Sequence, residues 1–157
     1  MFTQMRRTDK ARTTQEAEKV LAEGAWGTLA LTLEDGYPYS VPVSHIYRDG
    51  CIYFHSALAG QKYTALLAGP KVCFSVVGES TRVLPGEFTV AYISAIAFGR
   101  AALVENPDEV LEALVLIANK YDPAASPQSI AEYNKIHLAR CCVFKITVEH
   151  LTAKGIA

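Results

Sequence analysis

Two short turns divide the first half of the chain into strands, and they restrict the fold more than any other feature. Glu-Asp-Gly at 34–36 separates an extended run at 26–33 from a second run at 39–47. Arg-Asp-Gly at 48–50 then leads into a third run at 51–55. Tight turns of this kind join antiparallel strands, whereas parallel strands need a long crossover. The pattern therefore predicts an antiparallel sheet and argues against a doubly wound nucleotide-binding fold.

Three further extended runs follow, at 72–77, 88–104 and 142–148, the last continuing into Leu151. Gly99 lies inside the long second run, where a glycine typically marks a bulge or bend, and long bent strands suit small barrels. Segment 78–87 has little periodicity and is predicted to be a loop that could cover a site.

Pro42 lies within the second of the first three runs. Proline cannot donate to a strand ladder, so it predicts an edge strand or a bulge. Backbone groups beside Pro42 would then be free for a ligand.

Helices are predicted around and between these strands. An N-terminal helix at 13–24 begins with a threonine and Glu16, as in a capping box, and ends at a glycine. A short helix ends at Gly69-Pro70, with Tyr63, Leu66 and Leu67 on one face. Residues 107–138 are predicted to form a helical insertion before the last strand. The result is an antiparallel barrel with attached helices, in a single domain over residues 1–157.

Composition limits the function classes. The 157 residues carry a formal net charge of -1, which gives no electrostatic footprint for nucleic acid or an anionic membrane. The four cysteines lack C-x-x-C spacing and are predicted to be reduced structural thiols. With no apolar leader or membrane-length segment in the sequence, we expect a cytoplasmic protein.

The segment Tyr-Phe-His-Ser-Ala-Leu-Ala-Gly-Gln-Lys at 53–62 carries most of the functional information. It is predicted to be a strand that ends in small residues and then opens a helix. The first amides of a helix lack internal partners and carry the positive end of its dipole, so they favour an anion. Lys62 would add a charge, although the spacing alone favours a solvated helical lysine. Ser56 would contact a ligand or merely cap the helix.

Other chemistries have less support. The residues around Gly60 lack the longer glycine-framed loop (Walker A) of P-loop nucleoside triphosphatases. The four histidines lie on different predicted elements without a zinc signature, and no G-x-S-x-G elbow indicates a serine hydrolase. The aromatic residues around the hairpins would serve core packing or a flat cofactor surface.

The motifs together resemble the pyridoxamine 5'-phosphate oxidase-like flavoproteins, nearest the nitroimidazole-resistance (NimA-like) branch. The resemblance rests on Asp-Gly-Tyr-Pro-Tyr-Ser-Val-Pro-Val at 35–43, Gly-Cys-Ile-Tyr-Phe-His-Ser-Ala at 50–57, Gly-Gln-Lys at 60–62, Tyr-Ile-Ser at 92–94 and Phe-Gly-Arg at 98–100. It covers nearly the whole chain.

The resemblance implies a mainly β (α+β) fold, a six-stranded antiparallel split β-barrel with peripheral helices. It also implies a homodimer that binds FMN in clefts between its subunits. The implied cofactor-binding residues are Val41, Pro42, Val43, Ser44, His55, Ser56, Gln61, Lys62 and Ser94. His55 is also the candidate catalytic residue, as a proton donor or substrate contact.

The sequence also departs from the true oxidases of that family. Val41 and Ile46 replace the arginine and lysine of their second strand, and Gln61 replaces a basic residue of their phosphate site. Oxidation of pyridoxamine phosphate is therefore not expected. The leading hypothesis is an FMN-dependent oxidoreductase that reduces a small organic acceptor, such as a nitroaromatic compound, with a reduced nicotinamide or another donor. The alternative is a non-catalytic module that binds or senses flavin or haem. A hydrolase that works without flavin is a third possibility.

Overall fold

The structure is a computed structural model that describes residues 2–156, so both end residues of the predicted domain lie outside it. Its strands are β1 (Ala11–Arg12), β2 (Gly27–Thr32), β3 (Pro38–Val43), β4 (Ile46–Arg48), β5 (Cys51–Ala57), β6 (Lys71–Val77), β7 (Arg82–Leu84), β8 (Thr89–Leu103) and β9 (Cys141–Ile156). Its helices are α1 (Thr14–Glu23), α2 (Gln61–Ala68), α3 (Pro107–Tyr121) and α4 (Pro127–His137), with a 3-10 turn at Thr8–Lys10.

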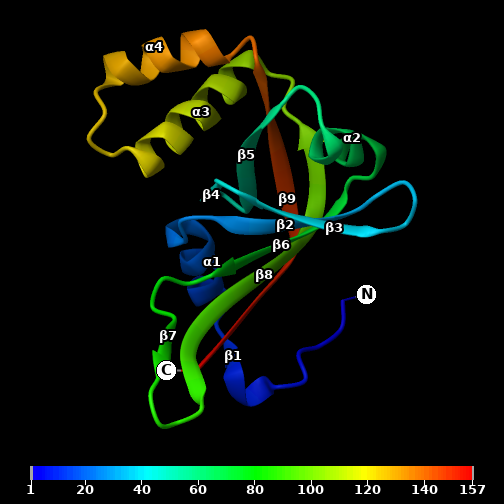
Figure 1. Cartoon of the computed structure of the whole chain (residues 1–157), viewed down its shortest axis with the longest axis vertical. Coiled ribbons are helices and arrows are strands. Elements are labelled where there is room, and N and C mark those ends of the chain that lie inside the picture. Colours follow the sequence, from blue (N-terminus) through cyan, green and yellow to red (C-terminus); the bar gives the residue numbers. More distant parts are fainter. Residues whose placement is uncertain (1, 157) are drawn as a thin grey trace.

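The strands form an antiparallel sheet in the order β3-β2-β6-β8-β9-β5-β4, with β1 paired to β9 and β7 paired to β8. The long strands β8 and β9 run side by side through the molecule and carry the shorter strands on either side (Figure 1). Within the described residues no ladder joins the edge strands β3 and β4, so the sheet stays open. The predicted antiparallel split-barrel architecture is confirmed, with nine strands rather than six.

The bulge predicted at Gly99 is confirmed. The pairing of β8 with β9 shifts register between Phe98 and Gly99, which lets the long strand bend. A Cβ atom at this glycine would run into the carbonyl oxygen of Thr147 on β9. Close backbone approach therefore requires glycine here, and the curvature of the barrel depends on it.

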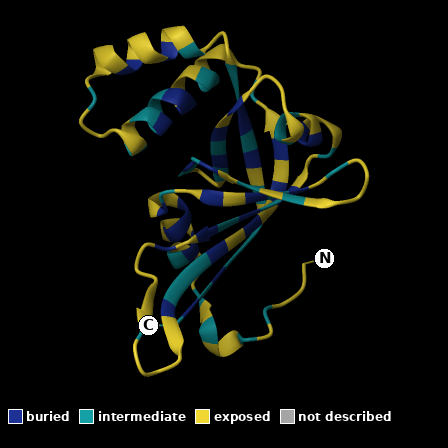
Figure 2. Cartoon of the chain, in the orientation of Figure 1, coloured by how far each residue is buried: buried dark blue, intermediate teal, exposed yellow. Residues whose placement is uncertain are grey.

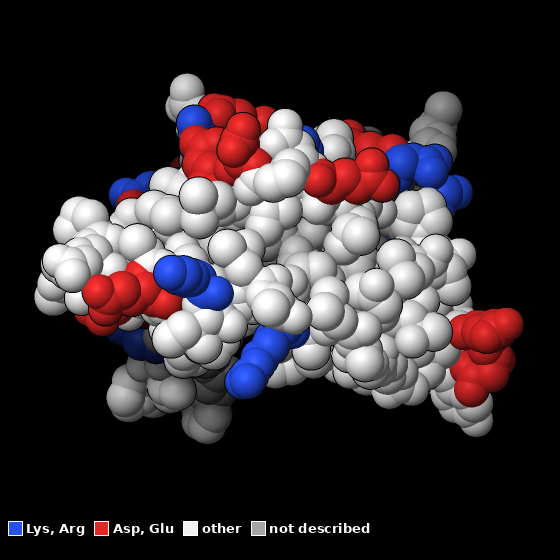
Figure 3. Space-filling model, turned by 90° about the horizontal axis from the view of Figure 1, so that it is seen from above, with Lys and Arg blue, Asp and Glu red and all other residues white. Residues whose placement is uncertain are grey.

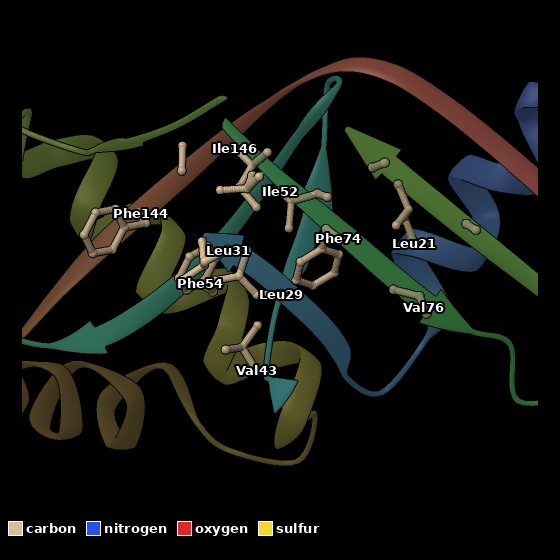
Figure 4. Packing of buried hydrophobic residues seen from close by; sticks show 14 of the residues in the cluster. Leu21, Leu29, Leu31, Val43, Ile52, Phe54, Phe74, Val76, Phe144 and Ile146 are labelled. Carbon is tan, nitrogen blue, oxygen red and sulfur yellow. The ribbon is translucent and has the colours of Figure 1, made fainter. Parts of the chain in front are cut away.

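The core lies inside the bent sheet. Phe54, Phe74 and Phe144 are fully buried and lie on three different strands. Leu29, Leu31, Val43, Ile52 and Ile146 point toward the same interior (Figure 4). Burial alternates along the strands, because successive side chains of a strand point to opposite faces (Figure 2).

The helix starts predicted from the sequence are present. Thr13 and Glu16 form a reciprocal capping box before α1, and the side chain of Asn106 accepts backbone bonds at the start of α3. The predicted apolar face of α2 is only partly right. Leu66 is buried, but Leu67 is 55% exposed and Ala65 takes its place in the core.

Three predicted boundaries were wrong. The run at 39–47 is broken into β3 and β4, and the predicted loop at 78–87 contains β7, which pairs with the start of β8. The last strand extends to Ile156 because β1 and β8 supply partners along its length. The strand breaks before β4 because side chains of α3 form hydrogen bonds with the backbone of His45. Its N–H donates to the Tyr121 hydroxyl at 2.9 Å, and Lys120 Nζ donates to its carbonyl at 3.0 Å.

All four cysteines are free and partly buried, as the spacing predicted. None of the helices within residues 2–156 is both long and apolar enough to cross a membrane. On the face seen from above, basic side chains stand apart from one another and form no continuous patch (Figure 3).

Candidate cofactor-binding site

The segment at 53–62 folds as predicted, from strand to helix. Strand β5 ends at Ala57, a short connection follows, and α2 begins after Gly60. Gly60 has a φ of 106°, a conformation that favours glycine, and no side chain caps the amides of the helix start. These amides are therefore available to an external acceptor such as a phosphate oxygen.

Lys62 lies at this helix start as a half-buried cation. Its Nζ is 5.7 Å from the ring centroid of Phe54, and burial lowers the pKa of its ammonium group. Among the described residues, no carboxylate lies within ion-pair distance of Lys62. A partly desolvated cation without a counter-ion is well suited to a bound anion.

Ser56 contributes a second unsatisfied group. It is 2% exposed, and its hydroxyl oxygen has no hydrogen-bond partner among residues 2–156. It lies two positions after Phe54, so both side chains project to the interior face of β5, the face over which the Lys62 ammonium lies. The predicted capping bond from Ser56 to the helix is not formed, because Gly60 holds the cap position.

His55 lies on the opposite face of β5 from Ser56. There it shares a cavity with His137 of α4 and with Ser44, which follows β3. Partial burial lowers the pKa of the His55 imidazole, and the nearby charges of Lys62 and His137 add to that effect. His55 is therefore favoured in its neutral form near pH 7, in which it both donates and accepts a hydrogen bond.

The predicted ring-binding residues lie on an edge strand. Pro42 pairs with Thr28 of β2, and β3 has no further strand beyond it, as the proline predicted. Val41 and Val43 pack toward the core, whereas Pro42 is exposed. The outer edge of β3 consequently presents backbone groups that the sheet does not use.

Ser94 is not brought near these residues within one chain. It lies opposite Lys154 of β9, whereas His55 lies opposite Val143 of the same strand. At about 3.3 Å per residue, roughly 35 Å of extended β9 separates the two register positions. Within one chain, Ser94 therefore lies apart from the other candidate residues.

Sequence reasoning missed the residues that surround His55. His137, Asn134 and Tyr133 of α4 line the same cavity, although more than 75 positions separate them from His55 in the sequence. Asn134 lies one turn after Ile130 on the buried face of α4, and a polar residue at such a position was the available signal. Within residues 2–156, no cluster of three potential metal ligands occurs, so the structure adds nothing to a metal hypothesis.

Comparisons with known proteins identify a family and a shared fold. A family model described as pyridoxamine 5'-phosphate oxidase matches residues 13–155. Among curated proteins, none matches the sequence significantly.

Several solved structures share the fold. A candidate 5-nitroimidazole antibiotic resistance protein from Bacteroides thetaiotaomicron is 22% identical, with a TM-score of 0.73 over 91% of this chain and 84% of that one. A conserved hypothetical protein from Mycobacterium tuberculosis is 18% identical, with a TM-score of 0.81 over 97% and 90%. An FAD- and haem-binding protein from Mycobacterium smegmatis is 16% identical, with a TM-score of 0.72 over 93% and 73%.

Proposed function

This chain belongs to the pyridoxamine 5'-phosphate oxidase family, and on that premise we propose that it is an FMN-binding oxidoreductase. In this proposal it passes electrons from a reduced nicotinamide, or another donor, to a small organic acceptor such as a nitroaromatic compound. The observation that carries the proposal is the uncapped start of α2 beside the unpaired, half-buried Lys62. The flavin-binding and nitroimidazole-resistance neighbours support it by fold.

The residues of this chain divide the task of holding FMN. Lys62 and the first amides of α2, including that of Gln61, hold the phosphate, and the buried hydroxyl of Ser56 supplies a further hydrogen bond. Backbone groups at the free edge of β3, from Val41 to Ser44, bind the polar edge of the ring. The flavin, when bound, supplies the electron-transfer chemistry.

His55 has the substrate-facing role. Its lowered pKa keeps the imidazole neutral at pH 7, so it offers an N–H to a substrate oxygen without adding a charge. Its position at the far side of β5 allows this contact while Lys62 holds the phosphate.

A second copy of the chain completes the site. Ser94 of β8 and His55 of β5 pair with distant positions of β9, so in this proposal Ser94 reaches a flavin that lies in a cleft shared with a partner. The outer face of the sheet carries exposed apolar side chains suited to such an interface: Val77 is 63% exposed, Ile96 40% and Phe98 39%. We therefore expect a homodimer.

The proposal is tested by a visible absorption spectrum of the purified protein after addition of FMN or FAD and removal of free flavin. Anaerobic additions of NADH and NADPH follow, and then a nitroaromatic acceptor. We expect retained FMN that one nicotinamide bleaches and the acceptor reoxidises. A colourless protein would refute flavin binding. Bound flavin that stays oxidised would favour a non-catalytic module that stores or senses flavin. A haem spectrum would favour a non-catalytic module that binds haem.

A further inference from the structure

A cavity of about 460 Å³ lies between the α3–α4 pair and the outward face of β5. We call it the α3–α4 cavity. The two helices lie together at one end of the molecule and stand over this end of the sheet (Figure 1). The volume falls within the range of small-molecule sites, about 300–1,000 Å³.

Apolar side chains of both helices form part of the walls of the α3–α4 cavity. Leu114 and Ile117 contribute from α3, and Ile130 contributes from α4. Each of these side chains is no more than 7% exposed, so the walls belong to the packed part of the helical insertion. Apolar walls with a few convergent polar groups are typical of sites that bind organic molecules.

Asn134 is the polar group that this packing leaves unexplained. It lines the cavity and is 2% exposed, and the described part of the chain offers its amide nitrogen no acceptor within hydrogen-bond distance. Buried polar atoms in proteins are nearly always hydrogen-bonded, and an unsatisfied donor is costly to keep. A ligand oxygen within hydrogen-bond distance of the Asn134 amide would satisfy this donor.

The remaining polar groups favour an uncharged ligand, and the aromatic rings of Tyr133 and His137 at the wall suit a flat one. Tyr133 and His137 lie at the cavity with ring centroids 4.1 Å apart and planes 30° apart, and His55 lies on the opposite side. Neither lysine nor arginine lines the cavity, and Asp122 is its one carboxylate, so an anion finds no counter-charge among these lining residues.

We infer that the α3–α4 cavity binds a small, uncharged, flat organic molecule that presents a carbonyl or nitro oxygen to the side-chain amide of Asn134. The cavity lies on the opposite face of β5 from Ser56 and shares only His55 and Ser44 with the proposed cofactor site. His55 is also the residue that the proposed function gives to the substrate, so the inference rests on that function for the role of the ligand, while the binding itself is tested without FMN.

The test compares two probes of matched shape, acetophenone and ethylbenzene, of which only acetophenone carries an acceptor oxygen. Each is titrated into ¹⁵N-labelled protein, and the assigned side-chain amide signals of Asn134 are followed by NMR. We expect saturable shifts at Asn134 and Ile130 with acetophenone. One net hydrogen bond corresponds to about fivefold tighter binding than for ethylbenzene.

Two variants sharpen the result. Asn134→Leu should weaken acetophenone about fivefold and leave ethylbenzene unchanged, whereas Glu132→Gln on the same helix should change neither. If Asn134→Leu fails to fold, the difference in affinity between the two probes for the wild-type protein still tests the inference. The inference would be overturned if neither probe caused saturable shifts at the cavity, which is the result expected if a second copy of the chain fills it. Equal affinity for both probes would also overturn it.

Repeating the titrations with and without FMN separates this inference from the proposed function. Probe binding in a protein that takes up no FMN supports the cavity and contradicts the proposed function. FMN uptake with no probe binding at the cavity would contradict the cavity inference and support the proposed function.

Discussion

Replacement of Lys62 by methionine tests the phosphate anchor most directly. The change removes the charge and keeps an unbranched side chain. The folded protein loses a cation–π contact at 5.7 Å, worth about 0.5–1 kcal/mol, and gains by no longer desolvating an ammonium group. Because Lys62 has no carboxylate partner in the described part of the chain, the free energy of unfolding should change by less than about 1 kcal/mol.

FMN binding should change far more. A hydrogen bond between a charged donor and a phosphate contributes about 1.5–3 kcal/mol, so the Kd for FMN should rise about 10- to 150-fold. The assay is quenching of flavin fluorescence at constant ionic strength, with stability measured by urea unfolding. Riboflavin, which lacks the phosphate, should bind Lys62→Met and the wild type alike. Lys71→Met, a change of an exposed lysine at the start of β6, is the matched control.

Two results would refute this reasoning. One is an FMN affinity within twofold of the wild type, which would remove Lys62 from the site. The other is equal weakening of FMN and riboflavin, which would show that the substitution damages the flavin-binding cleft rather than a phosphate contact.

Three further predictions concern the fold. Thr13→Ala should cost about 1 kcal/mol of stability in urea unfolding by removing the capping box of α1, and an unchanged midpoint would contradict that. Gly99→Ala should cost about 1–3 kcal/mol because its Cβ meets a β9 carbonyl, while Gly69→Ala, whose nearest atom is 4.0 Å away, should be nearly neutral in the same assay. Burial and the charge of a neighbouring lysine lower the pKa of His45 to about 4, so the unfolded chain binds more protons below pH 6.5. Stability should therefore fall as pH drops from 6.5 toward 4, by at most about 3 kcal/mol, and His45→Gln should lack this component when unfolding is measured at each pH.

The sequence determined the features that short-range interactions specify. The turns at 34–36 and 48–50, the cap at Thr13 and the bulge at Gly99 each depend on residues that are neighbours in the chain or on one glycine. Pro42 restricted its strand to an edge position or a bulge, because a proline has no N–H to donate, and the structure has the edge position. The antiparallel fold class follows from these local rules together.

Tertiary structure decided which distant segments of the chain are in contact. The break between β3 and β4 arises because Lys120 and Tyr121 of α3 bind the backbone there, and no local pattern contains that contact. The strand at 82–84 forms only because the start of β8 pairs with it.

The candidate site divides in the same way. Its helix start and Lys62 could be identified from residues 53–62, since strand, glycine and helix are contiguous. That His55 faces α4 while Ser56 faces the core follows from the register of β5 on β9, and that Ser94 lies far from both follows from the length of β9. Such pairings join residues that are distant in the chain, so their energy depends on the assembled sheet and not on the sequence around any one of them.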